Sequence, residues 1–260
     1  MDKNELFQQG IELWRQGDGE GRRKAIDCFR MAADLGHADA MYCLGLYCEE
    51  HIEDYYRKEP KTVEWYTKAA LAGCVEAQFR LGWYYERSPV RLLIQEGADA
   101  LRTMMANTDD SPFFAKSEGD LQNYKFKAMK WYRMAAQNGH REAKLYLGLI
   151  YDQGIGPDSM EMNKEEAERL YLEAAEQGLP AAQCRMAFLY MFGGQTIEKD
   201  PGKAIEWYKK AADNGSDTAR YCLGIYYEKG IGVEKDEQTA RQYYRSLTSI
   251  PAWTASKPKP

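Results

Sequence analysis

The sequence is short of the residues that most often build metal and catalytic sites. It has three histidines, at positions 37, 51 and 140, and six cysteines without a Cys-x-x-Cys pair. The cysteine spacing is irregular, whereas a disulfide ladder or a zinc site requires a regular one. We therefore expect reduced, mostly buried thiols at Cys28, Cys43, Cys48, Cys74, Cys184 and Cys222.

The chain also lacks a long apolar run. None of its segments approaches the roughly 20 residues needed to span a bilayer, and the start, Met-Asp-Lys-Asn-Glu, has no apolar signal-peptide core. These absences predict no membrane insertion and a cytoplasmic location, or a periplasmic one if a signal peptide has been removed.

An excess of basic residues is missing as well. The chain has 35 Lys and Arg against 40 Asp and Glu, a net charge of -5. This balance argues against a nucleic-acid partner, because the phosphate backbone attracts basic surfaces. A basic or amphipathic protein or peptide fits better.

Common catalytic motifs are absent. No GxSxG, HExxH or GxxxxGK[ST] occurs, and the Gly154–Gly156 and Gly230–Gly232 pieces follow expected helices, whereas a nucleotide-binding loop follows a strand. The sequence thus predicts neither an enzyme nor a cofactor. The alternative is a metal-dependent hydrolase that gathers a metal with Asp109, Asp110, Glu118 and Asp120.

What the sequence does contain is an internal repeat. An Ala-Ala pair stands three residues before a glycine in five segments, which end at Gly36, Gly73, Gly139, Gly178 and Gly215. A second motif, such as YCLGLYC, surrounds a small residue at Gly10, Gly45, Gly82, Gly148, Ala187 and Gly224, with spacings of 35, 37, 66, 39 and 37. A period near 37 predicts two helices and a turn per repeat, and the long spacing indicates one insertion.

Helical spacing and end signals place the elements. The five glycines after the Ala-Ala pairs are expected at helix C-caps with positive φ, and Asp200-Pro201 marks a helix start. We expect first helices near 4–16, 38–50, 74–87, 140–153, 179–192 and 216–229. Second helices are expected near 20–35, 60–72, 124–138, 163–177, 200–214 and 236–249.

Two segments carry a family resemblance. KAIEWYKKAADNG (Lys203–Gly215) and GIYYEKGIGVEKDEQTA (Gly224–Ala240) closely resemble the Sel-1-like repeat, a relative of the tetratricopeptide repeat. The match covers most of Lys24–Tyr244, and it departs from the family where Cys28 and Leu170 replace the usual Trp and Ala187 replaces the Gly.

The resemblance implies an all-α fold, a right-handed α-solenoid of about six helix-turn-helix repeats, with a concave face that is lined by the first helices and receives partners. We expect a single repeat domain over 1–255, an insertion at 88–123 and a flexible tail at 256–260. The insertion is expected to hold a helix over 90–105 and a mobile stretch over 106–120.

A row of side chains is expected to face the concave groove. The alternative is that these side chains only pack between repeats. Acidic residues late in the first helices (Glu49, Glu86, Asp152, Glu228) are not explained by the helix dipole, which favours negative charge at the other end. The predicted partner-binding residues are Phe7, Trp14, Tyr42, Phe79, Trp83, Glu86, Leu149, Asp152, Phe188, Met191, Tyr221 and Glu228.

These features favour a protein-protein interaction scaffold or adaptor that binds a partner segment in its concave groove. Bacterial relatives of this kind include immunity proteins for secreted toxins, which is a second form of the same hypothesis. His37 and His140 follow the capping glycine in the same repeat position, so we expect them to be structural.

Overall fold

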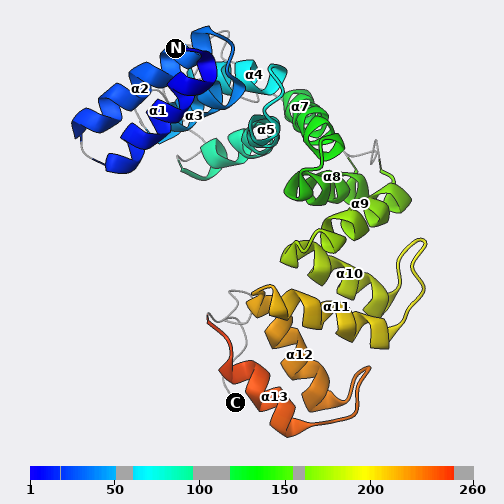
Figure 1. Cartoon of the computed structure of the whole chain (residues 1–260). Helices are drawn as coiled ribbons and strands as arrows, with labels where there is room; N and C mark the ends of the chain where they lie inside the picture. The colour runs from blue at the N-terminus through cyan, green and yellow to red at the C-terminus, as the bar shows by residue number, and fades with distance from the viewer. Residues whose placement is uncertain (18, 51–60, 96–117, 155–161, 249–260) are drawn as a thin grey trace. The chain divides into compact units, whose positions relative to one another are not determined.

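The computed structural model describes residues 1–17, 19–50, 61–95, 118–154 and 162–248, with the backbone alone at 87–95 and 118–124 (Figure 1). These ranges contain helices and no strand. The expected all-α repeat fold is confirmed. The helices are α1 (Lys3–Gln16), α2 (Gly19–Asp34), α3 (Ala38–Glu50), α4 (Lys61–Leu71), α5 (Val75–Gln95), α7 (Glu118–Gln137), α8 (Arg141–Gln153), α9 (Lys164–Glu176), α10 (Pro180–Phe192), α11 (Pro201–Asp213), α12 (Asp217–Lys229) and α13 (Glu237–Arg245).

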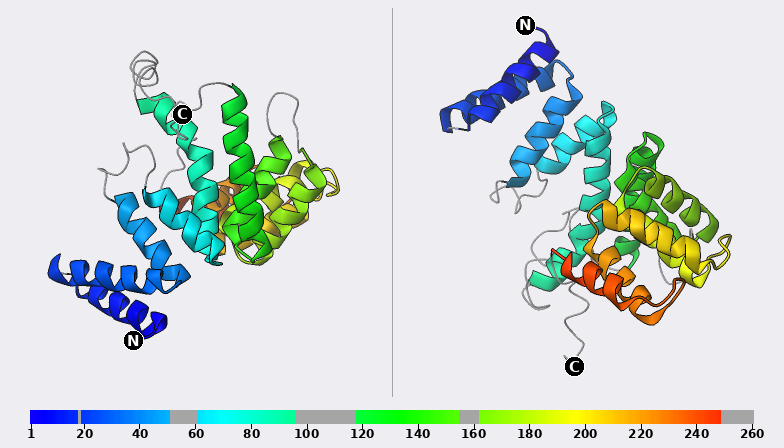
Figure 2. Two further views of the ribbon diagram at one scale, coloured as in Figure 1. Left: turned by 90° about the horizontal axis from the view of Figure 1, so that it is seen from above. Right: turned by 60° about the horizontal axis from the view of Figure 1, so that its bottom comes forward.

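The helices pack as consecutive pairs in two compact units. The first unit, Met1–His140, holds the pairs α1 with α2, α3 with α4 and α5 with α7. The second unit, Arg141–Pro260, holds α8 with α9, α10 with α11 and α12 with α13. Figure 2 shows α1 and α2 lying side by side. We call the earlier helix of each pair the first helix and the later one the second helix.

Most helix ends agree with the expected ends to within one residue, and the exceptions flank the insertion and the C-terminus. α5 continues past Pro89 to Gln95, and α7 already begins at Glu118. A proline removes one helical hydrogen bond without forbidding the helix, so the end expected at 87 was wrong. The rest of the expected 90–105 helix, most of 106–120 and the tail lie outside the described residues. α13 ends at Arg245 and not at 249.

The Ala-Ala-x-x-Gly motif closes the five second helices that precede α13. All five predicted glycines have positive φ, between 80° and 95°, which confirms the prediction. In α11, Gly215 N donates to Ala212 O at 3.0 Å and Ser216 N donates to Ala211 O at 2.9 Å. The two alanines therefore supply the carbonyls that this left-handed cap uses, and their methyl groups are small enough for close helix packing.

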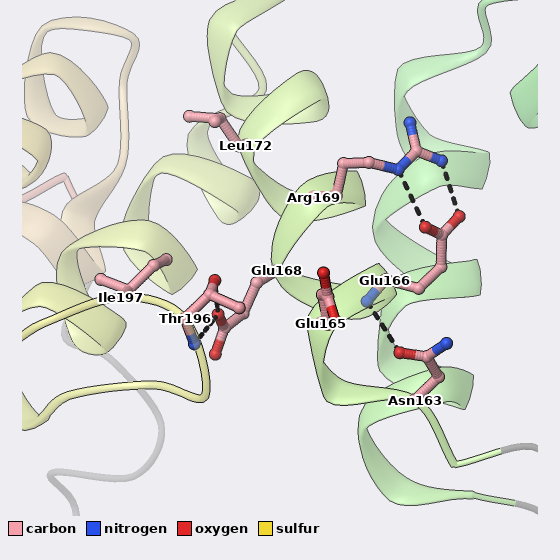
Figure 3. Close-up of a pocket in the computed structure, with 8 residues that line it drawn as sticks. All are labelled: Asn163, Glu165, Glu166, Glu168, Arg169, Leu172, Thr196 and Ile197. Carbon is pink, nitrogen blue, oxygen red and sulfur yellow. Dashed lines mark hydrogen bonds and ion pairs between the residues drawn. The ribbon is translucent and has the colours of Figure 1, made fainter.

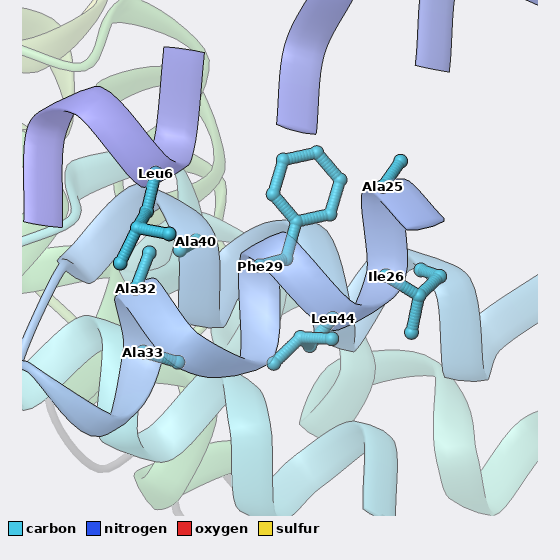
Figure 4. Packing of buried hydrophobic residues seen from close by; sticks show 8 residues of the cluster. All are labelled: Leu6, Ala25, Ile26, Phe29, Ala32, Ala33, Ala40 and Leu44. Atoms are coloured by element: carbon cyan, nitrogen blue, oxygen red, sulfur yellow. The ribbon is translucent and has the colours of Figure 1, made fainter. Parts of the chain in front are cut away.

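The core runs between the paired helices. In the first pair Phe29 of α2 packs among Leu6, Ala25, Ile26, Ala32, Ala33, Ala40 and Leu44 (Figure 4). The second helices of the next pairs bury Tyr66, Tyr132, Tyr171 and Tyr208 in the same place. These aromatic side chains fix how closely a first helix approaches its second helix.

Candidate partner-binding faces

A glycine of the first helix lies directly against the ring of the second helix. A Cβ atom added at these glycines would lie 2.3 to 2.7 Å from the nearest ring carbon, closer than van der Waals contact allows. The ring thus occupies the space that a side chain would need. The contacts are Gly10 with Phe29, Gly45 with Tyr66, Gly82 with Tyr132, Gly148 with Tyr171 and Gly224 with Tyr244.

The late carboxylates accept hydrogen bonds from these tyrosines. The hydroxyl groups donate from Tyr66 to Glu49 at 2.5 Å, from Tyr132 to Glu86 at 2.6 Å, from Tyr171 to Asp152 at 3.5 Å and from Tyr244 to Glu228 at 2.9 Å. A buried hydroxyl needs a partner, so each carboxylate has a reason to be at a helix end that disfavours negative charge. The sequence analysis missed this internal role of Glu86, Asp152 and Glu228.

The two exceptions support this interpretation. Phe29 has no hydroxyl, and Trp14 stands where the other pairs have an acid, with its ring 6.3 Å from that of Phe29. In the pair α10 with α11, Ala187 replaces the glycine and Tyr208 hydrogen bonds to Tyr226. Met191 occupies the acid position there and is only 4% exposed. Met191 is therefore a core residue, and its prediction as a partner contact was wrong.

Two arginines in equivalent positions neutralise part of this charge. Arg185 contacts Asp152 at 2.5 Å, and its guanidinium lies over the rings of Tyr171 and Phe188. Arg80 lies 4.0 Å from Glu49 and hydrogen bonds to Tyr42. Burial, with a smaller part from Asp152, raises the pKa of Tyr171 to about 12, so its hydroxyl stays a donor at neutral pH.

Several predicted residues pack against rings of their own helix pair or of the turn that follows it. Phe7 stacks on His37 and Phe79 stacks on His140, both with 4.4 Å between ring centroids. The equivalent contacts agree with the structural role expected for the two histidines. Tyr42 and Tyr221 lie 5.7 and 5.9 Å from Tyr66 and Tyr244. Packing between helices accounts for all four predicted residues.

Three other predicted residues stand one position after the central small residue of their first helices. Trp83 is half-buried, and Leu149 is half-buried against the core of the second unit. Phe188 is 46% exposed and contacts Phe192, which is 63% exposed, with 4.7 Å between ring centroids. Phe192 was not predicted as a partner contact, although the sequence distinguishes it. The other repeats have a charged or polar residue at the same position: Arg15, Glu50, Arg87, Gln153 and Lys229.

Glu168 is a second residue that the sequence analysis missed. Its position holds Ile26, Val63, Met129 and Ile205 in other second helices, yet the acid is only 5% exposed. Its carboxylate accepts hydrogen bonds from Gln195 N, from Thr196 N at 2.8 Å and from Thr196 Oγ1 at 2.5 Å. Glu168 thus holds the loop between α10 and α11.

A cavity of about 570 Å³ lies beside this loop (Figure 3). Among its charged side chains Arg169 is paired with Glu166, and Arg169 also contacts Glu173 outside the lining. Across the described residues no group of three or more His, Cys, Asp or Glu side chains is arranged to hold a metal. The lining residues are Asn163, Glu165, Glu166, Glu168, Arg169, Leu172, Thr196 and Ile197.

The six cysteines all lie in the part of the chain that the structure describes. All six cysteines are reduced, and burial raises the pKa of Cys43, Cys74 and Cys222 to about 11. Cys74 is buried and the other five are half-buried, so these thiols are more exposed than expected.

The hydrolase alternative depends on four acidic residues whose side chains lie outside the described part. Asp109 and Asp110 lie outside the described residues, as do the side chains of Glu118 and Asp120. Within the described ranges, no helix is long and apolar enough to cross a membrane.

Glu76 provides a test of the contact between α5 and the turn that follows α7. Its hydrogen bond with His140, 3.0 Å long, is the main cause that lowers the pKa of Glu76 below its ordinary value of 4.5. A lowered pKa adds stability above the unfolded-state value, and this contribution is lost as the pH falls through the folded-state value. We expect Glu76→Gln to be less stable than the wild type at pH 7 and equally stable well below pH 4.5 in urea titrations. A difference that persists unchanged at low pH would contradict this prediction.

Comparison with known proteins supports the repeat assignment. The Sel1 repeat pattern matches residues 8–37, 38–74, 75–90, 116–140, 141–179, 180–216 and 218–247. The segments 75–90 and 116–140 correspond to the paired helices α5 and α7, which flank the insertion. The matches extend over all six helix pairs.

Two curated relatives and one solved structure are similar to the chain. Chitin synthase regulator SKT5 of Saccharomyces cerevisiae is 25% identical over 88% of this chain, and DAP3-binding cell death enhancer 1 of Rattus norvegicus is 30% identical over 47%. The aligned part is 30% of each relative's length. The crystal structure of a Sel1 repeat protein from Oxalobacter formigenes is 25% identical, with a TM-score of 0.70 over 96% of this chain and 88% of that one.

Proposed function

Since the chain belongs to the Sel1 repeat family, whose members act as protein-interaction scaffolds, we propose that it is a non-enzymatic scaffold or adaptor that holds a segment of a partner protein in the concave groove expected along its first helices. The names of two relatives, a chitin synthase regulator and a DAP3-binding protein, describe proteins that act through other proteins. Their own partners are not assigned to this chain.

The exposed pair Phe188 and Phe192 carries the proposal. Two adjacent aromatic side chains that remain in water are unfavourable in a protein with no partner, and aromatic residues are the commonest energetic centres of protein interfaces. α10 also contains no acidic residue, and its one basic residue, Arg185, is paired with Asp152. α10 itself therefore brings no unpaired charge to the two rings, and a partner can cover them without desolvating an unpaired charge of this helix.

Trp83 and Leu149 remain proposed partner contacts beside this pair. We propose that five further predicted residues keep this face in shape, since each of them packs on a neighbouring ring: Phe7, Trp14, Tyr42, Phe79 and Tyr221. We propose that the carboxylates of Glu86, Asp152 and Glu228 contact the partner only at the edge of the interface. Each of them already accepts a hydrogen bond from a tyrosine hydroxyl.

Replacing both aromatic residues tests the function. The partner is captured from the native organism with the wild-type chain, identified by mass spectrometry and titrated by calorimetry. We expect Phe188→Gln with Phe192→Gln to weaken binding by about 2 kcal/mol or more, the scale of an interface hot spot, with an unchanged helical spectrum.

The matched control is Leu35→Gln with Leu71→Gln, which changes two leucines that are 55% and 72% exposed, the first directly after α2 and the second at the end of α4. It should bind within a factor of about three of the wild type, since isolated exposed apolar residues contribute little. Normal binding by the double Phe variant would remove α10 as the site.

The same titration separates an adaptor from an immunity protein. An immunity protein must block a toxin and should bind at nanomolar concentration or tighter, about -12 kcal/mol, whereas a micromolar constant fits an adaptor. We favour the adaptor, because a largely half-buried face with a single exposed aromatic pair is modest for the tightest class of complexes.

A further inference from the structure

Glu168 is an acidic residue inside the core of the second unit. It is only 5% exposed, whereas other second helices have an apolar residue at this position, such as Ile205 of α11. Removing a carboxylate from water costs free energy unless hydrogen bonds replace those to water, and an apolar side chain would avoid this cost. The packing of α9 alone therefore does not explain why an acid stands here.

The loop between α10 and α11 supplies the hydrogen bonds. Gln195 and Thr196 are themselves exposed, yet the backbone N–H of each donates to the carboxylate, and Thr196 Oγ1 donates as well. Figure 3 shows Thr196 lying directly against Glu168. A Cβ atom added at Gly194 would overlap the carboxylate. The loop backbone thus fits closely around this one side chain.

The equivalent loop between α12 and α13 is held in another way. Ile205 takes the position of Glu168, and Gly232 of that loop lies so close to α11 that an added Cβ atom would be 2.8 Å from Pro201 O. Van der Waals contact is therefore enough to hold such a loop. The acid of α9 adds directional hydrogen bonds, which fix two backbone amides in place.

The fixed loop begins directly after the exposed aromatic pair. Phe192 is the last residue of α10, and Gly193 N closes the helix with a 2.7 Å hydrogen bond to Leu189 O. Gly194 N then donates to Ile197 O at 2.8 Å, which encloses the two residues bonded to the acid. Helix ends open more readily than helix centres, and a fixed turn after the helix opposes this opening.

We propose that Glu168 is a positioning residue for the aromatic pair of α10, which rests on the scaffold function proposed above. Its carboxylate fixes the loop and so keeps the last turn of α10 closed. Phe192 is thereby held beside Phe188, with 4.7 Å between the ring centroids. The partner then meets an aromatic surface that is already ordered, and such preorganisation increases affinity. Glu168 itself does not contact the partner.

Two variants of the full chain release the loop from opposite sides. Glu168→Met replaces the acid by the residue that α7 has at this position, Met129. Gly194→Ala adds the methyl group that overlaps the carboxylate, and Gly194 has no positive φ that would itself disfavour Ala. Ile205→Met is the matched control, because it introduces the same side chain at the equivalent buried position of α11.

Amide exchange measured by NMR reports the loop directly, since Gln195 and Thr196 are exposed and their N–H groups donate to Glu168. We expect both amides to exchange at least about tenfold faster in Glu168→Met and in Gly194→Ala. The nuclear Overhauser contacts between the rings of Phe188 and Phe192 should weaken in the same variants. The control should leave the exchange and the ring contacts unchanged.

Binding and stability separate positioning from a purely structural role. Affinity for the partner captured above should fall about fivefold in Glu168→Met, because the ring pair is no longer ordered in advance. The urea midpoint of this variant should stay at the wild-type value, since an apolar residue in place of a buried acid is often neutral for stability. A loss of binding with an equal loss of stability would contradict the proposal.

Unchanged exchange of the two loop amides in Glu168→Met would also overturn it, as would faster exchange with unchanged ring contacts. Neither result affects the scaffold function if the Phe188 and Phe192 double variant still loses the partner. Faster exchange and weaker ring contacts with normal partner binding would have the opposite meaning. Glu168 would then position the end of α10, and α10 would be rejected as the binding site.

Discussion

Replacing Tyr208 by Ala should lower the free energy of unfolding by about 3 to 5 kcal/mol, as truncation of a buried aromatic residue does. Tyr208 is only 4% exposed and packs among Ile205, Leu223 and the half-buried ring of Tyr226. Its removal leaves a cavity between α11 and α12 that rigid helix backbones cannot close. Urea unfolding followed by circular dichroism measures the loss.

Tyr208→Phe is the matched control, because it keeps the ring and removes only the hydroxyl. Its cost should be near 1 kcal/mol, the net contribution of one buried hydrogen bond, here to Tyr226. If Tyr208→Ala lost less than about 1 kcal/mol, the ring would not be part of the core and the assignment of helix faces would be wrong.

The substitution Gly148→Val makes the opposite change, because it fills the space at a glycine. It should lower the free energy of unfolding by about 3 kcal/mol. A Cβ at Gly148 would lie 2.7 Å from a ring carbon of Tyr171 and 3.3 Å from the backbone oxygen of Ala167. Val has a slightly higher helix propensity than Gly, but the gain is only a few tenths of a kcal/mol. Steric overlap therefore decides the sign.

Gly19→Val provides the comparison, because nothing lies within 4 Å of the Cβ position at Gly19. Its unfolding free energy should stay within about 0.5 kcal/mol of the wild type, which is usual for surface changes. Similar losses in both variants would mean that the contact with Tyr171 does not determine the need for glycine.

Local signals explain why the sequence predicts so much of this fold. The Ala-Ala-x-x-Gly motif determines where each second helix ends, since the alanine carbonyls and a left-handed glycine make one cap. The period then assigns first and second helices without long-range information. The error at Pro89 lies where the helix α5 continues although the local signal favours its end.

The candidate site was harder to predict, because its roles depend on contacts across helices. Spacing within one helix shows that Glu86 and Glu228 are unfavourably placed, but not that Tyr132 and Tyr244 donate to them. Glu168 and Phe192 become visible only when each position is compared across all repeats, since both replace the residue type that the other repeats carry there. That comparison requires the sequence alone.

The glycine, the tyrosine and the carboxylate of each bonded set all come from a single helix pair. One helix pair therefore contains both sides of its closest contact, the glycine with the tyrosine ring and the carboxylate with the tyrosine hydroxyl. A duplicated gene segment of one repeat period would encode all of these residues together. Arrays of this kind can lengthen by duplication without compensating mutations elsewhere. For protein engineering, the same property marks a pair as a cassette whose outer first-helix residues can be varied to recognise new partners, provided that these three positions are left unchanged.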